Sequence, residues 1–161
     1  MRLLAYTLLA ATLLAAGQAS AATPPARTAA LVITVRSVTT ASIPRDTPPK
    51  GASKGDRVVM RDRLVNVHRQ FGKPAGATVG RDEGVLVLSS PTSGTFDGVT
   101  TLPGGTMRLH GIIRDGIETF TVVGGTGRYA HARGTISVGP GASPLNVYRL
   151  GFPGKKPVVV V

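Results

Sequence analysis

The chain has 161 residues, of which 19 are Lys or Arg and 8 are Asp or Glu, so its formal net charge is +11. With 42% hydrophobic and only 17% charged residues it can bury a core, which excludes a disordered polybasic tail. Cysteine is absent, which excludes disulfides, thiolate metal sites and cysteine nucleophiles. Aromatic residues make up only 4% of the chain, which argues against a base-stacking surface for single-stranded nucleic acid.

The first 21 residues have the features of a cleavable secretory signal. Arg2 supplies a positive charge, residues 3–16 are apolar, and Ala19-Ser20-Ala21 are small residues that a signal peptidase reads. The apolar run is shorter than the ~20 residues that a membrane span needs, and no other long run follows. We therefore predict a secreted, extracytoplasmic protein that has no stable membrane span after signal cleavage.

Residues 22–30 are expected to form a flexible leader, and residues 31–161 a single domain. Export makes nucleic acid an unexpected partner. The positive charge is instead expected to serve solubility, or a weak attraction to anionic polymers or headgroups that salt would screen.

The exported part of the chain shows the period-two alternation of β-strands and no convincing helical periodicity. Clusters of Gly, Pro, Asp and Ser separate eight predicted strands: 31–39, 56–69, 78–88, 95–102, 106–114, 117–123, 133–138 and 145–150. Eight short strands favour an all-β fold, an antiparallel closed barrel. The stretch 41–55 carries three prolines and two glycines, so it is predicted to be a loop at the rim, either a plain connection or a functional lid.

The second predicted strand is the most informative for chemistry. Alternation places Asp62 and Asn66 on the same face as Met60 and Leu64, the more apolar face. An unpaired carboxylate there is costly, so Asp62 is expected to have a partner, a raised pKa or a ligand. A hydrogen bond that only sets the strand register, or a place at the barrel mouth, remains an alternative. The opposite face, expected to be wet, carries Arg57, Arg61, Arg63 and Arg69.

The histidines do not indicate a metal site. His68, His110 and His131 lie in different segments without an acidic cluster beside them, and His110 is expected to face outward. No GxSxG motif is present, so a serine hydrolase is not expected either. We predict no metal.

A glycine-rich segment at residues 122–134 reads VVGGTGRYAHARG. It lacks the long helix that follows a dinucleotide-binding turn and the Lys-Ser/Thr of a phosphate loop. It is expected to form a tight glycine turn, one short helical turn over 129–132, and a return into a strand. Tyr129 is predicted to close one end of the barrel, and Arg133 to bond nearby carbonyls or a carboxylate.

This segment resembles the VxGGTGxFxxARG signature of the allene oxide cyclase-like and dirigent-like barrel superfamily. Similar motifs occur in the same order at Gly55-Asp56 with Asp62-x-Leu64, at residues 76–84, and at residues 94–111 with their LPGG turn. The resemblance covers residues 31 to about 150. It implies an eight-stranded antiparallel barrel whose apolar lumen holds a small hydrophobic molecule, with no metal or organic cofactor.

The two activities that the resemblance implies both depend on confinement. Allene oxide cyclases are isomerases that shape a reactive lipid epoxide for ring closure, and dirigent proteins orient phenoxy radicals. The lumen cysteine of the cyclases is absent here, and Gly127-Arg128 stand where some dirigent proteins have acidic residues. Whether the chain is an enzyme stays open; if it is, we expect an isomerase that performs an intramolecular cyclisation.

Five residues are candidates for the site. Asp62 is expected to polarise or deprotonate an oxygenated substrate, and Asn66 to stabilise the developing charge. Phe120 and Tyr148 are candidate ligand-binding walls, and Arg133 a ligand-binding candidate near one end.

Three functions are therefore compared. The first is a secreted, cofactor-free cyclase, isomerase or stereochemical guide for a small hydrophobic metabolite. The alternative is a non-enzymatic secreted carrier of such a molecule. The third is a basic envelope-binding protein with a solidly packed barrel. A homo-oligomer is compatible with all three.

Overall fold

The computed structural model describes residues 29–114 and 117–153. The predicted signal peptide, nearly all of the predicted leader and the last eight residues of the predicted domain lie outside the described residues. Within the described ranges, no helix is long and apolar enough to cross a membrane.

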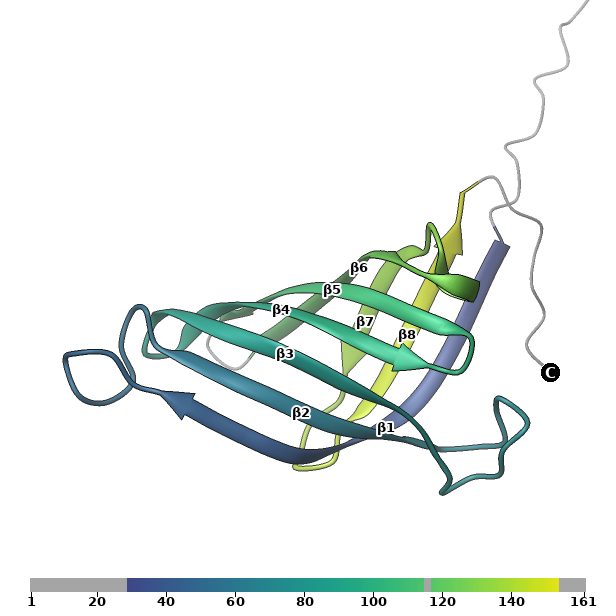
Figure 1. Cartoon of the computed structure of the whole chain (residues 1–161), viewed down its shortest axis with the longest axis horizontal. Helices are drawn as coiled ribbons and strands as arrows, with labels where there is room; N and C mark the ends of the chain where they lie inside the picture. Colours follow the sequence, from purple (N-terminus) through teal and green to yellow (C-terminus); the bar gives the residue numbers. More distant parts are fainter. Residues whose placement is uncertain (1–28, 115–116, 154–161) are drawn as a thin grey trace, which may run out of the picture.

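Eight antiparallel strands close into a barrel in sequence order, with β8 pairing back onto β1 (Figure 1). The strands are β1 (Ala29–Arg45), β2 (Arg57–Asn66), β3 (Thr78–Ser90), β4 (Ser93–Leu102), β5 (Gly105–Arg114), β6 (Ile117–Gly125), β7 (Arg133–Val138) and β8 (Leu145–Phe152). The predicted fold class is confirmed. Every predicted strand is present, and most bounds agree within two residues.

Two boundaries differ from the prediction. Strand β1 continues to Arg45, through residues expected to be loop, because residues 41–45 pair with β2 after a bulge at Thr40. Pro44 is tolerated there because β8 pairs β1 only as far as Arg36, which leaves that edge of β1 without a ladder. Strand β2 ends at Asn66 rather than at residue 69, because the chain turns there into the loop that precedes β3.

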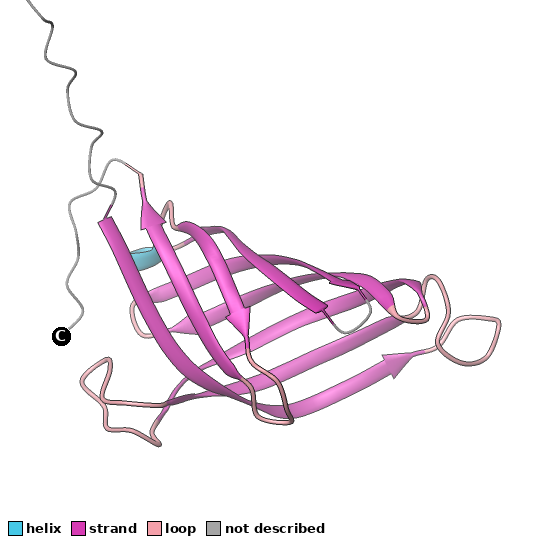
Figure 2. Ribbon diagram, turned by 180° about the vertical axis from the view of Figure 1, so that it is seen from behind, coloured by secondary structure: helices cyan, strands magenta, loops and turns pink. Residues whose placement is uncertain are grey.

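One end of the barrel is packed solid. The short 3-10 helix η1 (Gly127–Tyr129) lies across it, beside the start of β1 and the end of β8 (Figure 2). Tyr129 is 1% exposed and its hydroxyl donates to the Pro103 carbonyl, so the predicted closure by Tyr129 is confirmed. The helical turn begins two residues earlier than predicted. The side chains that fill this end include Leu64, Val79, Leu102, Met107, Val122, Ala132 and Leu150.

The glycine turn docks on the LPGG turn between β4 and β5. The amide of Arg128 donates to the Gly104 carbonyl, and the amide of Thr126 to that of Thr106, both at 2.8 Å. Gly127 has φ +57°, and a Cβ there would overlap the Gly104 carbonyl oxygen. Only glycine allows the two turns to approach this closely. The GGTG motif therefore forms a tight turn that packs against the LPGG turn.

Candidate functional site

The other half of the barrel is hollow. A cavity of ≈ 590 Å³ lies inside it and reaches the β7–β8 loop. Strand β7 has six residues and pairs β6 only through Phe120, Thr121 and Val122, so the wall is short here and leaves a mouth. A barrel packed solid throughout, the third function considered above, does not fit this lumen. The larger apolar side chains of the wall are Met60, Phe96, Leu109, Ile113, Phe120, Ile136 and Val138, and polar side chains share the wall with them.

Two phenylalanines shape the cavity. Phe96 on β4 and Phe120 on β6 meet edge to face, with ring centroids 5.4 Å apart and ring planes at 83°. Phe120 can lie flat against β5 because its neighbour there is Gly111, where a Cβ would overlap the ring. Edge-to-face packing is a preferred arrangement of aromatic rings, so the pair forms an aromatic wall of fixed geometry.

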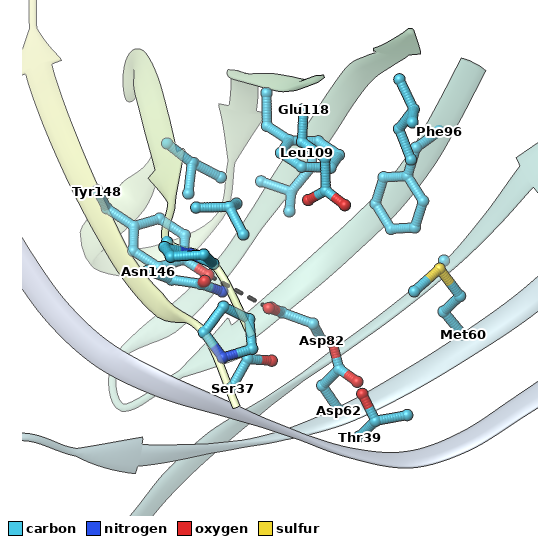
Figure 3. A pocket seen from close by; sticks show the side chains of 18 of the residues that line it. Ser37, Thr39, Met60, Asp62, Asp82, Phe96, Leu109, Glu118, Asn146 and Tyr148 are labelled. Carbon is cyan, nitrogen blue, oxygen red and sulfur yellow. Dashed lines mark hydrogen bonds between the residues drawn. The ribbon is translucent and has the colours of Figure 1, made fainter. Parts of the chain in front are cut away.

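Two aspartates face each other across the floor of the cavity. Asp62 on β2 is the direct register partner of Asp82 on β3, and both line the lumen (Figure 3). Oδ1 of each is buried without a hydrogen-bond partner in the described part of the chain. Thr39, also a register partner of Asp62, precedes the β1 bulge, and such bulges bend a strand and redirect its side chains.

Asp82 has the environment of an acid–base group. Burial raises its pKa to about 6; the Asp62 charge adds to the rise, and hydrogen bonds from Thr100 and Tyr148 oppose it. The Tyr148 hydroxyl donates to Asp82 Oδ2 at 3.3 Å and lies 3.4 Å from Thr100 Oγ1. Burial, followed by the nearby Asp82 charge, raises the pKa of Tyr148 well above its usual value, so this phenol stays protonated and donates. Near neutral pH, Asp82 can both accept and release a proton.

Glu118 adds a third carboxylate at the mouth. It is an exposed residue of β6 whose carboxylate points into the cavity (Figure 3). Partial burial raises its pKa, and the Asp62 charge contributes further. Ser37 and Asn146 complete the polar lining; Ser37 Oγ and Asn146 Oδ1 are buried without partners in the described residues.

The structure brings three of the five predicted site residues together. Asp62, Phe120 and Tyr148 line the same cavity. Tyr148 was expected only as an apolar wall, yet its hydroxyl is the hydrogen-bond donor to Asp82.

Asn66 does not line this cavity. It shares a face with Asp62, but four residues of strand, ~13 Å, separate the two. Its Nδ2 donates to the carbonyls of Gln70, Lys73 and Pro74, so it holds the β2–β3 loop and has no amide hydrogen directed at a ligand. The role of Asn66 beside Asp62 is therefore corrected to a structural one.

Arg133 does not line the cavity either. It is exposed at the start of β7, next to the packed end, and its Nη1 donates to the Ala132 carbonyl at 2.9 Å. The expected bond to a nearby carbonyl is confirmed. The expectation that Arg133 binds the ligand is corrected, because the residue lies at the packed end, away from the cavity.

Sequence reasoning did not identify Asp82 or Glu118. A signal for Asp82 was available, because it alternates with Gly80, Gly84 and Leu86 on the inward-facing side of its strand. Glu118 precedes Phe120 by two residues on β6, so it shares that residue's inward face.

The basic residues lie outside the lumen. Arg57, Arg61 and Arg63 are exposed on β2, as predicted, and His110 is exposed and bonded to Asp97 at 2.9 Å. A second, more open hollow of ≈ 620 Å³ runs along β2 and β3, and its basic residues are Arg61, Arg63, Lys73 and Arg81.

No family model matches the chain, and no curated protein matches it. Among solved structures, it is similar to a pyocyanin demethylase (TM-score 0.64, 20% identity, covering 74% of this chain and 99% of that one). It is also similar to the Diels–Alderase AbmU from Streptomyces koyangensis (TM-score 0.61, 19% identity, covering 81% of this chain and 72% of that one). A third similar structure is the pterocarpan synthase dirigent protein PsPTS1 (TM-score 0.56, 17% identity, covering 81% of this chain and 98% of that one). These likenesses concern the fold: the chain has a β-barrel fold similar to those of these three proteins.

Proposed function

We propose that the protein is a secreted, cofactor-free cyclase, isomerase or stereochemical guide that acts on a small hydrophobic metabolite held in the lumen. The observation that carries the proposal is the Asp62–Asp82 pair, with a Tyr148 donor, inside a cavity that also presents apolar and aromatic side chains. The volume of ≈ 590 Å³ lies within the range of small-molecule sites. A carrier of a neutral hydrophobic molecule needs only apolar contacts, whereas a proton-transfer step uses a buried carboxylate whose pKa lies near neutrality.

In this proposal the wall selects the folded shape of the substrate. The crossed rings of Phe96 and Phe120 limit its orientations, which lowers the entropy that the reaction must lose. Asp82 then accepts a proton from the substrate or returns one, while Tyr148 holds the carboxylate in place. Solved barrels of similar fold include a Diels–Alderase and a pterocarpan synthase dirigent protein, which supports a reaction controlled by confinement.

The test compares Asp82→Asn with Asp97→Asn, a matched control on the exposed outer face. Each purified protein is incubated with a hydrophobic-metabolite extract of the source organism, and mass spectrometry measures which compounds are retained and which change. We expect the wild type and Asp97→Asn to convert the same compound, and Asp82→Asn to retain it while converting it ~10²–10⁴-fold more slowly. Asp62→Asn is also expected to fold and to lose turnover.

Each other outcome has a definite meaning. Retention without conversion by the wild type would identify a carrier. Equal conversion by Asp82→Asn would remove this carboxylate from the mechanism. If nothing is retained or converted, the lumen has no such function.

A further inference from the structure

The lumen concentrates acidic residues in a basic protein. Of the seven acidic residues that the structure describes, four line the cavity, namely Asp62, Asp82, Glu83 and Glu118, and none of the described lining residues is Lys, Arg or His. The carboxylate of Glu83 is occupied, because it lies 4.0 Å from Arg61 and 3.7 Å from Arg81. Within the described ranges, Asp62, Asp82 and Glu118 have no ion-pair partner.

The unpaired polar atoms of the lumen are mostly acceptors. Oδ1 of Asp62, Asp82 and Asn146 can only accept hydrogen bonds when the carboxylates are ionised, and none has a partner in the described structure. Asn146 and Ser37 are 7% and 2% exposed, so these oxygens lie deep in the wall rather than at the rim. A buried acceptor without a donor is costly, and a ligand that supplies donors removes that cost.

The remaining wall suits an apolar, ring-sized body. Phe96 and Tyr148 present aromatic surface to the cavity, and Met60 adds an adaptable apolar contact (Figure 3). Phe120 lines the same cavity. Aromatic faces attract cations as well as apolar groups. An anionic ligand would meet three carboxylates without a compensating positive charge.

We infer that the ligand is a hydrophobic organic cation, an amine-bearing molecule whose protonated nitrogen lies between Asp62 and Asp82 and whose apolar body rests against Phe96 and Phe120. An ammonium group offers three donors and no acceptor, which matches the acceptors of the floor. This inference rests on the proposed function, because it names the substrate class of the same cavity.

Three probes that share a naphthylmethyl body compare the effect of charge. 1-Naphthylmethylammonium is the cation, 1-naphthylmethanol the neutral isostere and 1-naphthylacetate the anion. The chain has no Trp, so naphthalene fluorescence reports binding with little protein background. Dissociation constants are measured for the wild type, for Asp62→Asn/Asp82→Asn, and for Asp97→Asn as the control.

We expect the wild type and Asp97→Asn to bind the cation at least about tenfold more tightly than the alcohol, because only the ammonium adds a charge–charge attraction to its hydrogen bonds with the carboxylates. The anion should bind most weakly. The double variant should bind the alcohol as well as the wild type does and lose the preference for the cation; retained alcohol binding also shows that it is folded.

Equal binding of cation and alcohol by the wild type, or an unchanged preference in the double variant, overturns the inference and leaves the proposed function standing. Failure of all three probes to bind contradicts both the inference and the proposed lumen function.

Discussion

Asp82 shows how a single residue acquires chemistry from its surroundings. The ordinary pKa of an aspartate is 3.8, whereas burial, together with the nearby Asp62 charge, raises the pKa of Asp82 to about 6. Asp56 shows the opposite case at the rim. Hydrogen bonds from Thr47 and Ser53 lower its pKa, so it stays ionised and serves as a structural acceptor.

The raised pKa of Asp82 predicts a pH dependence of stability. The pKa of Asp82 is 3.8 in the unfolded chain and about 6 in the folded chain, so between these pH values the folded state binds more protons. The contribution of Asp82 to the free energy of unfolding is therefore fully present below pH 3.8. It is lost as pH rises through 6, at most about 3 kcal/mol in all. Asp62, Glu118 and Tyr148 are the titratable groups that face it across the cavity.

Asp82→Asn removes this dependence. Thermal unfolding of the wild type and the variant at pH 4 and pH 8 should show the variant gaining stability relative to the wild type at the higher pH. A difference between the two proteins that is the same at both pH values would show that Asp82 titrates alike in the folded and unfolded chains.

At the scale of elements, strand lengths separate the packed end from the hollow end. The turns at η1 and between β4 and β5 bring backbone into close contact, whereas the six-residue β7 pairs with β6 at Phe120, Thr121 and Val122, and among the described residues the start of β6 pairs with β5 alone. The loop between β2 and β3 belongs to the structural part. Asn66 Nδ2 reaches three of its carbonyls, at 2.9, 3.1 and 3.3 Å.

Asn66→Ala should therefore reduce stability and leave ligand binding intact. The loop carbonyls lose their buried donor, which costs about 1–3 kcal/mol. Chemical denaturation measures the loss, and the naphthylmethylammonium dissociation constant measures the lumen. A large loss of probe affinity in a folded Asn66→Ala protein would contradict this prediction and show that Asn66 contributes to ligand binding.

At the scale of the whole molecule, charge is divided between two surfaces. The exposed faces of β2 and β3 carry arginines, whereas the lumen carries carboxylates without lysine or arginine. A net charge of +11 repels an approaching cation even where the cavity attracts it. Equilibrium affinity and association rate should thus respond differently to salt.

Stopped-flow mixing with naphthylmethylammonium checks this division. Raising salt from about 0.01 M to about 1 M shortens the Debye length from ~30 Å to ~3 Å. We expect the association rate constant to rise over this range, because the outer repulsion is screened. A rate constant that falls with salt would mean that the lumen carboxylates dominate the field which the cation meets.

Local patterns were sufficient for the architecture. Alternation of apolar and polar residues, broken by Gly and Pro, predicted eight strands, and the same alternation placed Asp62 inward and the arginines outward. The GGTG turn was predictable because adjacent glycines favour a tight turn. What holds it in place is not local, because the turn docks on the LPGG turn and the Tyr129 hydroxyl bonds to the Pro103 carbonyl, 26 residues away.

The site depended on the tertiary structure. Alternation states which face of a strand a residue occupies and leaves open which residue lies opposite, because that depends on register. Register places Asp82 opposite Asp62, and closure of the barrel brings Tyr148, 66 residues further along the chain, to Asp82. Asn66 shares a face with Asp62 and still lies outside the cavity, because position along the barrel axis decides which inward residues pack the closed end and which line the lumen.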